Sequence, residues 1–149
     1  SVTPEGEFFR SLLTVRRIIE PAAAALAATE ATEEDVARIR RAYQQMESAQ
    51  TATELLEPDL EFHRAVMAAT HNDMLAFIGN MMSLALTESI KLTSRHPDTH
   101  ALSLPRHKAI MTAIEHRDPL GARQASLVQL ENAKADAETI LVIGRPIAG

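Results

Sequence analysis

The chain has 149 residues, enough for one domain with a buried core, and its 46% hydrophobic and 23% charged residues are typical of soluble globular domains. Its formal net charge is −5, which makes it a poor candidate for binding a nucleic-acid phosphate backbone. Cysteine is absent, which excludes disulfides, thiolate metal ligands and thiol nucleophiles.

The sequence gives no sign of a membrane segment. No apolar run approaches the roughly 20 residues that span a bilayer. The start "SVTPEGEFFR" lacks the basic and apolar regions of a signal peptide, and it also lacks an initiator Met. We therefore expect a cytoplasmic protein without membrane contact, present here as a processed or truncated chain.

Apolar residues recur with helical spacing along the whole chain, and no alternating stretch predicts a strand. The frequent Ala and Leu favour helices, because these residues lose little conformational freedom in them. The six predicted helices cover residues 6–28, 33–49, 53–69, 74–95, 102–118 and 119–143. With short connections between them, they predict an all-α antiparallel bundle.

Local signals mark several helix boundaries. Pro21 is expected to bend the first helix without ending it, because an Ala run follows. "TEED" (32–35) predicts a capping box in which Thr32 is the N-cap and Asp35 replaces the usual Glu. Pro119 suits the first position of the last helix, with Asp118 as its cap.

The predicted connections follow from turn-forming and helix-breaking residues. They are "AQTATE" (49–54), "THND" (70–73) and "HPDTH" (96–100). Pro105 should limit how early the fifth helix begins, and "GRP" (144–146) should stop the sixth.

One arginine lies on an apolar stripe of the first helix. Arg16 shares the helical face of Phe9, Leu12 and Ala23, so its side chain should point inward. A buried guanidinium needs an anion. Spacing favours an internal ion pair with Glu20, one turn further on, over a clamp for the carboxylate of a ligand.

A carboxylate and two imidazoles also lie on inward faces. Asp59 and His63 are one helical turn apart, a spacing that suits either a metal site or an ordinary hydrogen-bonded pair. His107, on the stripe of the fifth helix, is a third inward donor, although a lone His there is more often a core residue. Gln129 lies on a mixed face of the last helix.

No catalytic motif is present. The chain has no Gly-rich phosphate loop, no nucleophile elbow and no HExxH sequence, and neither Ser103 nor Ser126 has an evident base partner. The sequence therefore gives no indication of an enzyme.

Three blocks resemble a known family in order and spacing. They are "VRRIIEPAAAALAA" (15–28), "DLEFHRAVMAATHN" (59–72) and "HKAIMTAIEHRDPLGARQA" (107–125). Together they resemble the C-terminal effector-binding (FCD) domain of GntR-type transcriptional regulators, the FadR subgroup. The opening segment is most similar to the branch that contains galactonate-operon regulators, and the resemblance spans about residues 7 to 140.

The resemblance implies a dimerising all-α bundle of about six to seven helices around a central cavity that binds a small carboxylate or sugar acid. Many members hold a divalent metal there through one Asp and three His. The motif places these ligands at Asp59, His63 and His107, while the third His falls on Gln129, which should weaken binding of Zn, Ni or a similar metal. It also assigns Arg16 a role facing the ligand.

The family's winged helix–turn–helix domain has no counterpart in this sequence. We therefore expect residues 1–149 to form a single effector-binding and dimerisation domain that reaches DNA only through an N-terminal domain absent here. Two alternatives remain open. One is a small metal-dependent enzyme with Asp59 or Glu61 as base, and the other is a purely structural dimerisation bundle.

Overall fold

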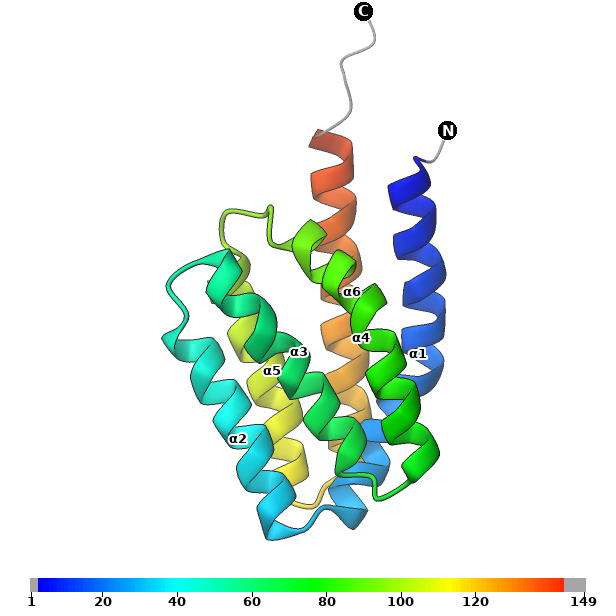
Figure 1. The fold of residues 1–149 in the computed structure, drawn as a ribbon, viewed down its shortest axis with the longest axis vertical. Coiled ribbons are helices and arrows are strands. Elements are labelled where there is room, and N and C mark those ends of the chain that lie inside the picture. Colours follow the sequence, from blue (N-terminus) through cyan, green and yellow to red (C-terminus); the bar gives the residue numbers. More distant parts are fainter. Residues whose placement is uncertain (1–2, 144–149) are drawn as a thin grey trace, which may run out of the picture.

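The computed structural model describes residues 3–143, and within that range the chain forms six α-helices and no strand. They are α1 (Pro4–Glu30), α2 (Glu33–Ser48), α3 (Ala52–Ala68), α4 (Asp73–Thr93), α5 (Thr99–Glu115) and α6 (Pro119–Ile143). Consecutive helices run in opposite directions, so the start of α1 and the end of α6 lie at the same end of the bundle (Figure 1). The predicted all-α antiparallel bundle is confirmed.

The predicted helix starts of α2 and α6 are confirmed in atomic detail. Thr32 accepts a hydrogen bond from the Asp35 backbone N–H at 3.1 Å, and Asp35 accepts one from the Thr32 N–H at 2.8 Å. Asp118 accepts from the Gly121 N–H at 2.9 Å at the start of α6. Pro21 lies inside α1 without ending it.

Helix α3 begins at Ala52, within one residue of its predicted start, because Thr51 caps it by accepting from the Glu54 N–H. The two boundaries of α5 were predicted wrongly. Helix α5 begins at Thr99 and runs through Pro105, since a proline there removes only one backbone hydrogen bond. The predicted stop at residues 144–146 lies outside the described residues.

Helix α5 also ends earlier than predicted, at Glu115. Arg117 adopts a left-handed conformation, with φ of 56°, which turns the chain out of the helix. The residue is held there by its side chain, which donates to the Ala31 carbonyl at the end of α1.

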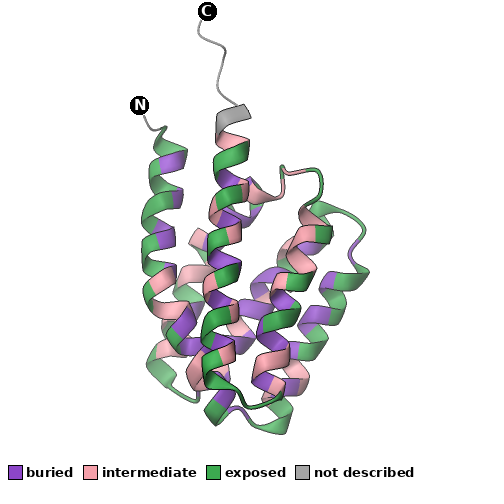
Figure 2. Ribbon diagram, turned by 180° about the vertical axis from the view of Figure 1, so that it is seen from behind, coloured by how far each residue is buried: buried purple, intermediate pink, exposed green. Residues whose placement is uncertain are grey.

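The core owes its close packing to small residues on α1. Ala24, Ala27 and Ala28 are fully buried, so the backbone of α1 approaches its neighbours closely. Phe62 of α3, also fully buried, fills the centre of the same core. Buried residues follow the inward face of every helix (Figure 2), which leaves the polar residues on those faces inside the bundle.

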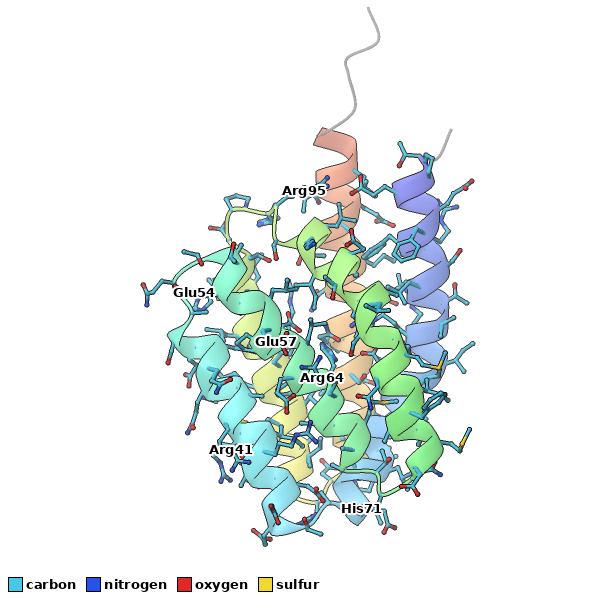
Figure 3. All side chains as sticks on the ribbon, in the orientation of Figure 1. Arg41, Glu54, Glu57, Arg64, His71 and Arg95 are labelled. Carbon is cyan, nitrogen blue, oxygen red and sulfur yellow. The ribbon has the colours of Figure 1, made fainter. Side chains whose placement is uncertain are left out.

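The outer surface of α2 and α3 is highly charged. Arg41, Glu54, Glu57 and Arg64 project from these two helices toward solvent (Figure 3). None of the helices in the described range is long and apolar enough to cross a membrane.

Candidate functional site

Five polar residues that the sequence predicts to face inward meet in the interior of the bundle. They come from four helices and are 2% to 9% exposed: Arg16, Asp59, His63, His107 and Gln129. All five line one cavity of about 40 Å³. The structure therefore brings together every predicted site residue.

The donor atoms of Asp59, His63 and His107 form a tight triangle. Asp59 Oδ1 lies 3.1 Å from His63 Nε2 and 3.2 Å from His107 Nε2, and the two nitrogens are 3.4 Å apart. Zinc holds such donors at about 2.1 Å, which corresponds to donor–donor distances of ~3.0 Å at right angles and ~3.4 Å in a tetrahedron. The triangle matches the edges of either arrangement, so this group could hold a metal ion.

The opposite nitrogen of each imidazole is held by an acceptor. His107 Nδ1 lies 2.9 Å from the Ser103 carbonyl oxygen, and His63 Nδ1 lies 3.4 Å from Glu20 Oε1. Because neither acceptor can donate, both Nδ1 atoms carry a proton. Each Nε2 is thereby directed into the cavity, as in metal sites where a second group fixes the tautomer of the ligand.

An aromatic ring fixes the planes of the two imidazoles. Phe62 packs edge-on against His107, with ring centroids 4.9 Å apart, and against His63 at 5.9 Å. Such edge-to-face contacts are favourable and restrict ring rotation. The two histidines are therefore positioned before any ligand binds.

Arg16 forms the internal ion pair that spacing favoured. Its Nε lies 2.5 Å from Glu20 Oε2, and its Nη2 lies 3.2 Å from Glu20 Oε1. The same guanidinium lines the cavity, so pairing with Glu20 and facing a ligand are compatible. Glu20 in turn joins Arg16 to His63.

The charges of this network are mutually stabilised. Burial by itself raises the pKa of Glu20, but Arg16 and His63 reverse this and lower it to about 2. Burial likewise raises the pKa of Asp59, yet His107 and His63 hold it well below its usual value. Burial lowers the pKa of His63, whereas Asp59 and Glu20 raise it to about 9. In the metal-free protein His63 is therefore protonated at neutral pH, and a metal would bind its Nε2 only by displacing that proton.

Gln129 supplies an acceptor that the protein leaves unused. In the described part of the chain, its Oε1 is buried and has no hydrogen-bond partner. An orphaned buried oxygen is costly unless a ligand or ion completes it. Together with the donor triangle, this oxygen is chemically compatible with a bound cation or with a ligand group that donates a hydrogen bond.

The sequence analysis missed two contacts around the site. It paired Glu20 with Arg16 but not with His63, which lies on another helix. It did not identify Arg106 and Asp136, which line the cavity as an ion pair at 2.6 Å. The sequence does place Arg106 directly before His107, which could have indicated that Arg106 lies near the site. Adjacent residues on a helix usually point in different directions, so this indication is weak.

The sequence predicts no base partner for Ser103, and the structure places an imidazole beside it that cannot act as one. Its Oγ lies 3.2 Å from His107 Nδ1, because a spacing of four residues stacks the two on α5. That nitrogen already donates to the Ser103 carbonyl. It therefore has no lone pair with which to activate the hydroxyl.

Two other histidines, His71 and His100, lie outside the cluster. His71 contacts Asp35 at 2.5 Å, and His100 lies 2.8 Å from the Met46 carbonyl. His100 belongs to α5 and not to the predicted loop. Neither residue lines the central cavity.

A second, smaller cavity is also lined by His63. It measures about 30 Å³ and has mainly apolar walls. His63 lines both cavities, and Glu20 and Arg16 line one each. The apolar walls are formed chiefly by Phe62, Val66, Met67, Met82, Leu86 and Ile110.

Comparison with known proteins gives one family. The family model described as the FCD domain matches residues 11–132. The solved structure of Streptococcus agalactiae GntR has the same fold, with a TM-score of 0.73 at 20% identity over 90% of this chain and 66% of that chain.

Curated relatives match over most of this chain. The galactonate operon transcriptional repressor of Escherichia coli (strain K12) is 31% identical, covering 80% of this chain and 53% of the repressor. The HTH-type transcriptional regulator LutR of Bacillus subtilis (strain 168) is 32% identical, covering 86% and 61%. The Uxu operon transcriptional regulator of E. coli (strain K12) is 35% identical, covering 83% and 51%. The chain thus spans a little over half the length of these relatives.

Proposed function

The chain belongs to the FCD domain family of GntR-type transcriptional regulators, and we propose that it senses a small carboxylate and relays its binding to DNA. The observation that carries this proposal is the convergence of Arg16, Asp59, His63, His107 and Gln129 on one buried cavity. Each of the three relatives described above is named as a transcriptional regulator or repressor, which argues against the enzyme alternative.

The chemistry of the cavity suits a carboxylate with a neighbouring hydroxyl or oxo group. Arg16 offers a guanidinium for the carboxylate, and Glu20 holds that guanidinium in place. Asp59, His63 and His107 would hold a divalent ion such as Zn or Ni, which would supply open coordination positions for oxygens of the effector. Gln129 adds a neutral oxygen where a third imidazole would bind a metal more strongly.

Regulation then requires two states with different affinity for the effector. Residues 1–149 would form a single effector-binding and dimerisation domain, with DNA bound by a winged helix–turn–helix domain outside this sequence. Effector in the cavity would favour one packing of the helices and so alter the spacing of the DNA-binding domains. This activity belongs in the cytoplasm, where DNA and metabolites meet.

Self-association has a suitable surface on α4. Between residues 74 and 87 this helix carries no charged residue, which is unusual for a helix facing solvent. Four large apolar side chains recur along its outer face and are 58% to 81% exposed: Met74, Phe77, Met81 and Leu84. Three more lie on the neighbouring α1: Phe8, Val15 and Ile18. We call these seven residues the apolar face.

The size of the apolar face fits a second copy of the chain. A fully exposed large side chain has roughly 200 Å² of accessible surface. Because the seven residues are 42% to 81% exposed, they present on the order of 800 Å² of accessible surface in total. Each partner buries about this much in a protein–protein interface of standard size. An apolar stripe is also self-complementary, as a two-fold dimer requires. The proposed homodimer would therefore use α4 and α1.

A matched pair of variants tests the dimer. Leu84 and Leu120 are 81% and 79% exposed, but Leu120 lies on α6, outside the apolar face. In sedimentation equilibrium, Leu84→Glu should yield monomers, whereas Leu120→Glu should leave the dimer unchanged. A dimer that survives Leu84→Glu, or a monomeric wild type, would exclude this surface.

Ligand binding tests the sensor. Small carboxylates and Zn²⁺ should raise the melting temperature of the wild type, and Arg16→Met should abolish the response to carboxylates. Arg41→Ala serves as the control, since Arg41 is exposed on α2 (Figure 3) and does not line the cavity. Turnover of a ligand during calorimetry would favour the enzyme alternative. No response to any carboxylate or metal would favour the structural bundle.

A further inference from the structure

The polar cavity approaches solvent on one side. Eight of the residues that line it are buried. The partly exposed ones belong to the end of α4, the first half of α5 and the second half of α6, and we call them the mouth of the cavity: Thr93, Thr99, Ser103, Arg106 and Asp136. These parts of the helices lie toward the end of the bundle where the described chain begins and ends (Figure 1). A route from solvent to the buried donor triangle therefore passes through the mouth.

One ion pair crosses the mouth. Arg106 Nη1 donates to Asp136 Oδ2 at 2.6 Å, and both side chains are 17% exposed. Among the described residues, it is the only side-chain hydrogen bond or ion pair between α5 and α6. The pair thus joins the two helices between solvent and the buried part of the cavity.

The packing of α5 against α6 changes along their length. Near the turn that connects them, Ile114 and Ala122 belong to the main core. Further from the turn, α6 packs through Leu130 and Ala137 into a cluster with residues of α1 and α4 and none of α5. The first half of α5 is therefore held to α6 chiefly by the ion pair, and a partly exposed ion pair holds weakly.

Resting on the proposed function, we propose that the Arg106–Asp136 ion pair is a gate that controls access to the polar cavity without contacting what binds there. While the pair is intact the mouth is closed around a cavity of about 40 Å³. When it breaks, the first half of α5 moves away from α6 about the turn at residues 116–118 and opens a path to His107. Because the pair is the same in the empty and the loaded protein, it sets the rates of entry and release and leaves the equilibrium affinity unchanged.

Chemical modification of His107 in metal-free protein measures the opening of the gate. Diethyl pyrocarbonate acylates unprotonated imidazole nitrogens, and peptide mass spectrometry locates each modified residue. His107 is 2% exposed and should react slowly, while exposed His116 serves as an internal reference for the reagent. In Arg106→Met, His107 should react about twofold to fivefold faster relative to His116, because the closed state has lost a weak ion pair.

Zinc kinetics provide the second readout. A chromophoric chelator in a stopped-flow instrument captures only Zn²⁺ that has left the cavity, and mixing the protein with free Zn²⁺ gives the entry rate. Arg106→Met should raise both rate constants by about twofold to fivefold. The dissociation constant should therefore stay within about twofold of the wild-type value.

Two further variants separate the gate from a general loss of stability. Asp136→Asn breaks the same pair from α6, so it should match Arg106→Met, and the double variant should be no faster than either single one. Arg40→Met removes a different ion pair between helices, from α2 to Glu115 of α5 at 3.2 Å, and neither of its residues lines the cavity. It should leave the reactivity of His107 unchanged.

The outcomes distinguish the gate from the proposed function. Unchanged modification of His107 in Arg106→Met, or equal acceleration in Arg40→Met, would overturn the gate. A weaker Zn²⁺ affinity with an unchanged entry rate would also overturn it, because Arg106 would then act on the bound state. If Zn²⁺ does not bind to any variant but His107 reacts faster in Arg106→Met, the gate stands and the metal site of the proposed function is wrong.

Discussion

Loss of the Glu20 carboxylate should destabilise the fold more than loss of its arginine partner. Glu20 contacts two cations, since Arg16 Nε lies 2.5 Å from it and protonated His63 lies 3.4 Å away. Glu20→Gln leaves Arg16 buried without an anion, and breaking a buried pair in this way costs about 3–5 kcal/mol. Arg16→Met leaves Glu20 paired with His63, so it should cost about 1–3 kcal/mol.

Urea unfolding followed by circular dichroism measures both losses. For a domain of this size, about 3–5 kcal/mol corresponds to a fall in melting temperature of roughly 6–20 °C. The double variant Arg16→Met/Glu20→Met should be more stable than Glu20→Gln, because no unpaired charge is left behind. If Glu20→Gln costs under about 1 kcal/mol, or less than Arg16→Met, then Glu20 does not link the two cations.

Three further predictions concern other parts of the bundle. Burial opposes the protonated form of His63, but its carboxylate partners raise its pKa from 6.5 to about 9. The stabilisation from its charge should therefore be complete below pH 6.5 and be lost as the pH rises toward 9, so unfolding free energies of wild type and His63→Gln should converge over that range. Thr32→Ala should cost ~1 kcal/mol in urea unfolding through loss of the α2 cap, and a neutral result would contradict the capping role. A Cβ at Gly79 would lie 2.9 Å from Met67 Cβ, so Gly79→Ala should push α4 away from α3. The variant should lower the free energy of unfolding by about 1–3 kcal/mol. A melting temperature at or above that of the wild type would show that α4 can shift freely.

Features that depend on neighbours in the chain could be predicted from the sequence. The capping box at Thr32 and the start of α6 at Pro119 involve hydrogen bonds across three residues, and both are present. The inward direction of Arg16 and His63 follows from the helical period alone. The start of α5 was predicted too late, because Pro105 removes only one backbone hydrogen bond and the helix continues through it.

The identity of the site residues and the geometry of the site have different origins. Helical spacing and the family resemblance together predict that four polar residues lie on inward faces: Asp59, His63, His107 and Gln129. Spacing could not show that the Nε2 atoms of two helices lie 3.4 Å apart, because that distance depends on how α3 and α5 are rotated and offset against each other.

The sequence by itself thus determined the helices, their polar inward residues and the family. Only the tertiary structure decided that Glu20 of α1 joins Arg16 to His63 of α3, and that Gln129 Oε1 of α6 has no hydrogen-bond partner among the described residues. The physical reason is the range of the forces involved. Helical period and capping act within one or two turns of a helix. Contacts between helices depend on side-chain packing across the whole core, which here includes the small alanines that let α1 pack closely against its neighbours.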